Sequence, residues 1–136
     1  METPKSPLDL IIEPIAKSHI VRDFSCGEKS IDLYIKRFAK KSTIAGYGRT
    51  YVAVKPGHFR VWAYYTIAAS YVDASSFHSL EGCPKNISVA LLERIGVEEQ
   101  LRGKGFGDAL MAHAFQVALQ SADLIGIHAV ILGIGL

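Results

Sequence analysis

Residues 100–114, QLRGKGFGDALMAHA, constrain the fold of this chain more than any other segment. Glycines stand at positions 103, 105 and 107, and the basic residues Arg102 and Lys104 precede the first two of them. Apolar residues then recur at spacings of three and four, which predicts a helix from about residue 107 to residue 120. The preceding stretch ISVALLERIGV is mostly apolar and predicts an interior strand of a sheet. The sequence therefore predicts a strand, a glycine loop and a helix in direct succession.

This loop has the chemistry of an anion site. A glycine has no side chain, so a ligand can approach its backbone N–H group closely. The start of a helix adds unpaired N–H donors and a partial positive charge, which suit a phosphate group. Arg102 and Lys104 would add screening charge. The alternative is that the three glycines only form a tight turn between a strand and a helix.

Two common phosphate-binding motifs do not fit the loop. A P-loop requires GxxxxGK[ST], and the Gly103-Lys104-Gly105 run offers no such spacing. A dinucleotide-binding fold requires GxGxxG after the first strand of a βαβ unit, whereas this loop reads GxGxG and comes late in the chain. A different phosphate-binding family is needed if the loop binds a phosphate.

The rest of the chain predicts an α/β fold in one domain, residues 1–136. We expect a first strand at Leu8–Ile15 and one or two helices between residues 23 and 41, with Ser25 and Glu28 at capping-box spacing. The stretches RTYVAVK and VWAYYTIAASYV predict a hairpin around Pro56 and Gly57. A loop follows at SSFHSLEGCPKN, and IGIHAVILGIGL predicts a last, buried strand. The order β, α, β, β, β, α, β indicates a mixed sheet flanked by helices.

Composition narrows the class of protein. The chain has 136 residues, of which 49% are hydrophobic and 21% charged, as in a globular domain with a real core. No apolar run reaches the roughly 18 residues of a membrane helix, and METPKSPLDL does not resemble a signal peptide. Cys26 and Cys83 form no CxxC pair, so we expect a cytoplasmic protein. Five dispersed histidines show no ligand spacing, so no metal site is expected: His19, His58, His78, His113 and His128.

The glycine loop resembles the Q/R-x-x-G-x-G/A motif of the GNAT acetyltransferases, which Gln100 to Gly105 matches. This resemblance implies a GNAT-like sheet and acetyl-CoA as co-substrate, with no metal. The pyrophosphate would lie on the backbone of six residues: Arg102, Gly103, Lys104, Gly105, Phe106 and Gly107. The pantetheine arm would pair with the backbone near Ile95 and Val97, extending the sheet.

The chain is more closely similar to the tRNA-acetylating GNAT toxins of bacterial toxin–antitoxin pairs. The segments FSCGEKSIDLYIKRFAKK, GRTYVAV, VWAYYTIA, LLERIGVEEQLRGKGFGDAL and SADLIGIHAVIL occur in the order of that family, from about Asp23 to Leu132. The resemblance implies acetylation of the α-amine of aminoacyl-tRNA, which blocks translation. It also implies a ribbon-helix-helix antitoxin as partner and a homodimer.

Further residues acquire possible roles from this resemblance. The basic side chains of Lys36, Arg37, Lys40, Lys41 and Arg49 are candidates for contact with tRNA phosphates, and the alternative is a solvated helix face. Glu93 on the central strand is a weak catalytic candidate that would relay a proton through water. Its alternatives are a charge at the mouth of the cleft or a salt bridge to a basic neighbour. We expect Cys26 to be a small buried residue, not a nucleophile.

The family pattern implies a tyrosine that protonates the leaving thiolate, on a helix after the fifth strand, and two more strands. This sequence ends in GIGL before that point, so we expect the last helix and strands of the fold to be absent and the domain to be incomplete at its C-terminus. An unpaired edge is then expected near Ile127–Leu132. Two alternatives therefore stay open: a catalytically inactive remnant that still binds CoA, RNA or an antitoxin, and a GNAT acting on a small amine or a protein N-terminus.

Overall fold

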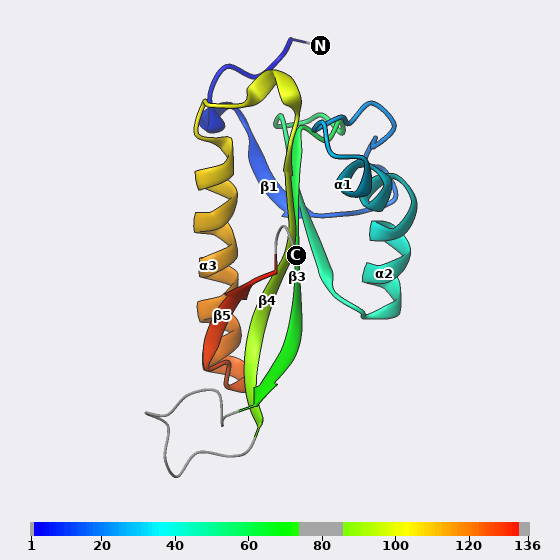
Figure 1. The fold of residues 1–136 in the computed structure, drawn as a ribbon. Coiled ribbons are helices and arrows are strands. Elements are labelled where there is room, and N and C mark those ends of the chain that lie inside the picture. Colours follow the sequence, from blue (N-terminus) through cyan, green and yellow to red (C-terminus); the bar gives the residue numbers. More distant parts are fainter. Residues whose placement is uncertain (1, 74–85, 134–136) are drawn as a thin grey trace.

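A computed structural model describes residues 2–73 and 86–133 of the chain. The predicted loop SSFHSLEGCPKN, with His78 and Cys83, lies outside the described residues except for its last residue. The described part forms one five-stranded sheet with helices on both faces (Figure 1). None of the helices in this part is long and apolar enough to span a membrane.

The five strands follow one another in space in the order β1-β2-β3-β4-β5. Their bounds are β1 Ile11–Pro14, β2 Arg49–Val54, β3 Ala63–Asp73, β4 Asn86–Val97 and β5 Ala129–Leu132. The first four are antiparallel neighbours, and β5 alone runs parallel to β4. A parallel neighbour requires a crossover, and the long helix α3 (Phe106–Ile125) supplies it. The predicted order of elements and the mixed sheet are thus confirmed.

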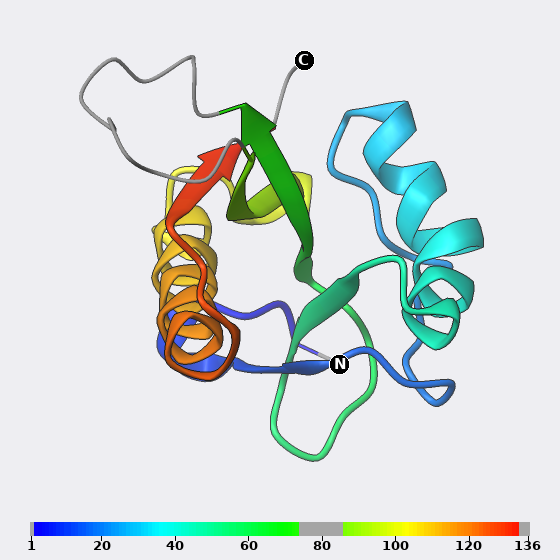
Figure 2. The same cartoon turned by 90° about the horizontal axis from the view of Figure 1, so that it is seen from below.

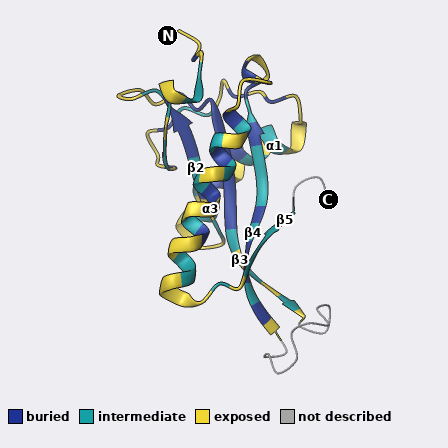
Figure 3. Cartoon of the chain, turned by 90° about the vertical axis from the view of Figure 1, so that its left-hand side faces the viewer, coloured by how far each residue is buried: buried dark blue, intermediate teal, exposed yellow. Residues whose placement is uncertain are grey.

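Helices cover the two faces of the sheet separately (Figure 2). On one face lie α1 (Lys29–Leu33), the π-helical turn η2 (Tyr34–Phe38) and α2 (Ala39–Ala45), which bury Ile35 and Ala39 against Val52 and Tyr64. On the other face α3 buries Leu110, Ala114 and Ala118 against Tyr65 and its neighbours. Successive strand residues point to opposite faces, so Tyr64 and Tyr65 belong to different cores. Figure 3 shows the buried strands between the half-exposed helices.

The long pairing of β3 with β4 is interrupted once. Thr66 is opposite Arg94 and Ile67 is opposite Leu92, so Glu93 is an extra residue in β4. This is a β-bulge, which re-aims the side chains next to it and is common beside active sites. The bulge separates β4 into two parts with different neighbours, and this difference positions the site described below.

Some predicted boundaries were wrong. The first strand is shorter than Leu8–Ile15, because a 3-10 turn occupies Pro7–Asp9. Ser25 does not cap a helix: its N–H donates to Glu98 Oε2 at 3.0 Å, and α1 begins only at Lys29. The last strand is half-buried rather than buried, because within the described residues no strand pairs with its outer edge.

Candidate active site

The second part of β4 has one open edge. β5 pairs with β4 only from Val89 to Leu92 within the described residues, and the N–H of Gly133 makes the last bond, to the Leu92 carbonyl at 2.9 Å. Beyond the bulge, β4 continues to Val97, and within the described residues β3 is the only strand beside it. The N–H of Glu98 bonds the Trp62 carbonyl at 2.9 Å, and backbone groups alternate between the two edges of a strand. The backbone groups of Ile95 and Val97 therefore face the open edge.

The predicted glycine loop begins at the end of this edge. After the 3-10 turn η4 (Glu99–Leu101), the chain turns through Gly103 and Gly105, whose φ angles are +74° and +87°. Both angles lie in the left-handed region, which glycine adopts without strain. Leu101 and Phe106 anchor the two sides of the loop in a small core with Trp62. The exposed turn between them is thus held in place by buried side chains.

The loop leaves a row of backbone donors free. The N–H of Ala109 bonds the Gly105 carbonyl at 3.2 Å and is the first donor of α3 to have a helical partner. Within the described residues, no backbone or side-chain acceptor contacts the N–H groups of residues 103–108. Lys104 is exposed beside them, and so is Asp108 in the first turn of the helix. Unpaired donors at the start of a 20-residue helix form an anion site.

Arg102 was expected to contribute a free positive charge and a free backbone N–H group to this loop, and the structure shows neither. Its guanidinium donates to the Cys26 carbonyl, and its backbone N–H bonds the Glu99 carbonyl at 3.3 Å. These contacts tie the loop to the segment before α1. The free donors therefore begin at Gly103, one residue later than predicted.

A cavity of about 950 Å³ lies at the other end of the open edge. Its walls come from α1 and η2 on one side and from β4 and Gly133 on the other. The lining residues are Glu28, Ser30, Ile31, Leu33, Tyr34, Phe38, Leu91, Glu93, Arg94 and Gly133. Four strand steps of about 3.3 Å separate Glu93 from Val97, so the cavity lies roughly 13 Å from the end of β4 that leads into the glycine loop.

The close approach of α1 to β4 depends on Gly96. A Cβ at this position would stand 2.7 Å from Ile31 Cγ2 and 3.2 Å from Phe24 Cζ, which is too close without movement. Tyr64 adds a polar contact, because its hydroxyl donates to the Ile31 carbonyl at 2.6 Å. Burial raises the pKa of Tyr64, so the hydroxyl stays protonated and keeps this donor role. Gly96 and Tyr64 thus fix the helical wall of the cavity.

Glu93 and Arg94 face this cavity side by side. Glu93 Oε2 lies 3.3 Å from Arg94 Nη1, and the Arg94 guanidinium lies 3.8 Å from the centre of the Tyr34 ring. The salt bridge that sequence analysis weighed against a catalytic role is therefore present, yet the carboxylate still lines the cavity. Sequence analysis missed Arg94 and Tyr34. The π-helical turn and the bulge bring these two side chains together. Neither feature has a recognisable sequence pattern, so no signal for this pair is present in the sequence.

The basic residues proposed for RNA contact separate into two groups. Lys36, Arg37, Lys41 and Arg49 are exposed. Lys40 is half-buried, and its Nζ donates to the carbonyls of Lys17 at 3.0 Å and His19 at 2.8 Å. Lys40 therefore holds the chain before α1 through its side chain, whereas the prediction gave it the same role in tRNA contact as the exposed four.

Cys26 is buried, as predicted. Burial raises the pKa of its thiol to about 11, so the thiolate is scarce at neutral pH, which disfavours a nucleophilic role. In the described part of the chain, no three His, Cys, Asp or Glu side chains are placed to hold a metal ion.

Comparison with known proteins gives a consistent result, although no family model matches the chain. A tRNA-acetylating toxin of Mycobacterium tuberculosis is 31% identical over 120 residues, which are 86% of this chain and 70% of that protein. The structure of AtaT complexed with acetyl-methionyl-tRNAfMet has a TM-score of 0.84 at 25% identity, and the match covers 91% of this chain and 77% of that one. An AtaT mutant toxin bound to the C-terminus of the antitoxin AtaR and acetyl-CoA has a TM-score of 0.77 at 27% identity, over 91% and 74% of the two chains.

Proposed function

This chain belongs to the family of tRNA-acetylating toxins, and from this membership we propose that it transfers the acetyl group of acetyl-CoA to the α-amine of an aminoacyl-tRNA, which blocks translation. The observation that carries the proposal is the row of free N–H groups at residues 103–108, joined by the open edge of β4 to a cavity. A phosphate site, an extended edge and a cavity in line match the three parts of acetyl-CoA.

The residues have distinct roles in this proposal. The N–H groups of Gly103, Lys104, Gly105, Phe106 and Gly107 bind the pyrophosphate. The backbone of Ile95 and Val97 pairs with the pantetheine amides, because its donors and acceptors face the open edge. Acetyl-CoA, when bound, would supply an activated acyl group: a neutral amine would form the new amide bond as the thioester C–S bond breaks and CoA leaves as the thiolate. The α-amine then approaches from the cavity side, past Tyr34 and Arg94.

Glu93 is our candidate for the proton acceptor. Its carboxylate lines the cavity at the bulge, and Arg94 orients it by the contact at 3.3 Å. A carboxylate in this position takes the proton from the attacking amine through a water. We expect Glu93→Gln to lower kcat with little change in KM for acetyl-CoA, because the glycine loop is untouched. An unchanged kcat would contradict the role of Glu93 as proton acceptor and leave it only the structural role of its salt bridge with Arg94.

The partners of this chain follow the same reasoning. Lys36, Arg37, Lys41 and Arg49 contact tRNA phosphates, since all four are exposed. A ribbon-helix-helix antitoxin binds the chain, and the active form is a homodimer. The AtaT mutant toxin bound to the C-terminus of AtaR supports an antitoxin partner, and the ribbon-helix-helix type and the homodimer rest on the family resemblance alone.

The test is an acetylation assay. The purified chain is incubated with labelled acetyl-CoA and a mixed pool of aminoacyl-tRNA, next to a Gly103→Glu variant. We expect label on the amino acid with the natural chain and none with the variant. Label on a simple amine or a protein N-terminus in preference to aminoacyl-tRNA would select the alternative acceptor. A folded chain that binds acetyl-CoA but yields no label would be a binding protein without transferase activity.

A further inference from the structure

A second open edge lies on β3, away from the acetyl-CoA edge. β2 pairs with β3 only up to Arg49 opposite Ile67, whereas β3 and β4 stay paired to Asp73. The bulge is in β4, so the alternation of backbone groups along β3 is unbroken. Since the carbonyl of Trp62, next to β3, accepts from the N–H of Glu98, next to β4, the backbone groups of Ala69 and Tyr71 face away from β4. Within the described residues, no strand lies beside them.

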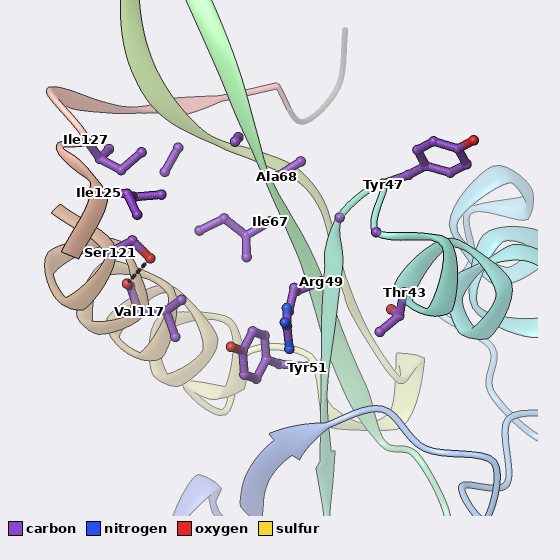
Figure 4. A pocket seen from close by; sticks show the side chains of 14 residues that line it. Thr43, Tyr47, Arg49, Tyr51, Ile67, Ala68, Val117, Ser121, Ile125 and Ile127 are labelled. Atoms are coloured by element: carbon purple, nitrogen blue, oxygen red, sulfur yellow. Dashed lines mark hydrogen bonds between the residues drawn. The ribbon is translucent and has the colours of Figure 1, made fainter.

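A cavity of about 420 Å³ adjoins this edge (Figure 4). It exists because β3 and β4 carry three small side chains here, Ala68, Ala69 and Ala90, between the end of β2 and the last turns of α3. The other apolar walls are Ile67, Val117, Ile125 and Ile127. The cavity has the size and the lining for one or two large apolar side chains.

The mouth of this cavity is polar and positively charged. Among the described residues that line it, Arg49 is the only charged one, and Tyr47 is 79% exposed. Thr43 also lines the cavity, and its hydroxyl is buried without a hydrogen-bond partner in the described part of the chain. Glu93 approaches Gly48 from the other cavity, but its carboxylate is paired with Arg94. The mouth therefore favours a carboxylate and offers a hydrogen bond to it or to a backbone group.

We propose that the β3 edge is a docking site for an extended peptide of another protein. The peptide continues the line of β2, antiparallel to β3, and hydrogen-bonds the backbone of Ala69 and Tyr71. One apolar side chain of the peptide fills the cavity between β3 and α3, and a neighbouring Asp or Glu pairs with Arg49. This mode of recognition is β-strand addition, in which the backbone supplies affinity and the side-chain pocket supplies specificity.

The chemistry of the edge selects a peptide over other ligands. Alternating N–H and C=O groups along a strand match another strand, and a nucleic acid or small metabolite lacks this repeat. A second copy of this chain is a weaker fit. Pairing β3 with β3 of another copy would leave both cavities without an inserted side chain and both Arg49 side chains without a carboxylate from that contact.

The experiment uses random twelve-residue peptides displayed on phage and selected on the purified full chain. We expect the selected peptides to share an apolar residue next to Asp or Glu. Binding of the synthetic peptide is then measured with two variants. Ala69→Pro removes one outward N–H and keeps the pairing with β4, as proline does on an edge strand. Val117→Phe fills the cavity from α3 without changing the edge. We expect each variant to weaken binding at least tenfold with an unchanged affinity for acetyl-CoA.

Amide hydrogen exchange along β3 provides an independent test of the open edge. In the free chain the amides of Ala69 and Tyr71 should exchange faster than those of Ala68 and Ser70, and the peptide should slow them. Equal exchange along β3 would contradict the open edge. No enriched peptide, or peptides that bind both variants unchanged, would overturn the proposal. Dimerisation of the natural chain that Ala69→Pro abolishes would assign the edge to a second copy instead. None of these outcomes depends on acetyl transfer.

Discussion

The glycine loop, residues 102–107, and the basic segment, residues 36–41, are both made of residues that bind anions, but the fold uses them differently. In the glycine loop the free donors are backbone N–H groups, fixed by the φ angles of Gly103 and Gly105 and by the start of α3. In the basic segment the donors are side chains, and the ammonium group of Lys40 donates hydrogen bonds to two carbonyls of the same chain.

The two segments differ in how far their local sequence determines which partner each donor group contacts. Backbone donors follow from the local conformation, which glycines and a helix start largely impose. The partner of a long charged side chain depends on what else the fold brings within reach. Arg102 shows the same limit inside the loop, because its guanidinium turns to the Cys26 carbonyl, 76 positions away. A glycine motif is therefore a better predictor of an anion site than a run of basic residues.

The largest effect is expected from placing a charge in the glycine loop. Gly103→Glu puts a carboxylate beside the free N–H groups, and we expect the affinity for acetyl-CoA, measured by titration calorimetry, to fall about 100-fold. Gly57→Glu is the matched control: its φ is +78° against +74°, and neither site has an atom within 4 Å of an added Cβ. Both variants should lose about 1 kcal/mol of stability from backbone strain. An equal loss of affinity in both would refute the anion site.

A salt titration of tRNA binding should distinguish the exposed lysines of the basic segment from Lys40. Lys41→Met removes an exposed charge, so we expect several-fold weaker binding and a log–log salt slope smaller by about one. Lys40→Met should leave the slope unchanged and instead lower the free energy of unfolding by about 1 kcal/mol, because two carbonyls lose their donor. If Lys40→Met changes the slope as much as Lys41→Met does, the division of this segment is wrong.

Sequence reasoning reached the fold because periodicity and turn residues encode it locally. The hairpin around Gly57, the strand before the glycine loop and α3 were all predicted within a few residues. It failed where long-range contacts decide the outcome. Ser25 has a good capping sequence, yet its N–H binds Glu98, 73 positions away. Arg94 and Tyr34 come together only through a bulge and a π-helical turn, and no pattern in either segment predicts their stacking.

The smallest effect concerns how α3 holds the glycine loop against the sheet. His113 Nδ1 lies 2.6 Å from the Tyr65 hydroxyl, with the Tyr51 ring stacked on Tyr65. Burial lowers the pKa of His113, so the fold favours the neutral ring. This stabilisation is present above the unfolded pKa of about 6.5 and is lost as pH falls through the lower folded value.

We therefore expect the thermal midpoint to decrease modestly between pH 7 and pH 5, and His113→Gln to reduce that decrease. Gln keeps a polar side chain for Tyr65 but does not titrate. Lys41→Met, which lies outside α3, serves as the control and should show the natural pH dependence. A pH profile that His113→Gln leaves unchanged would mean that other groups control the acid response. Protonation of His113 would then have no effect on how α3 holds the glycine loop against the sheet.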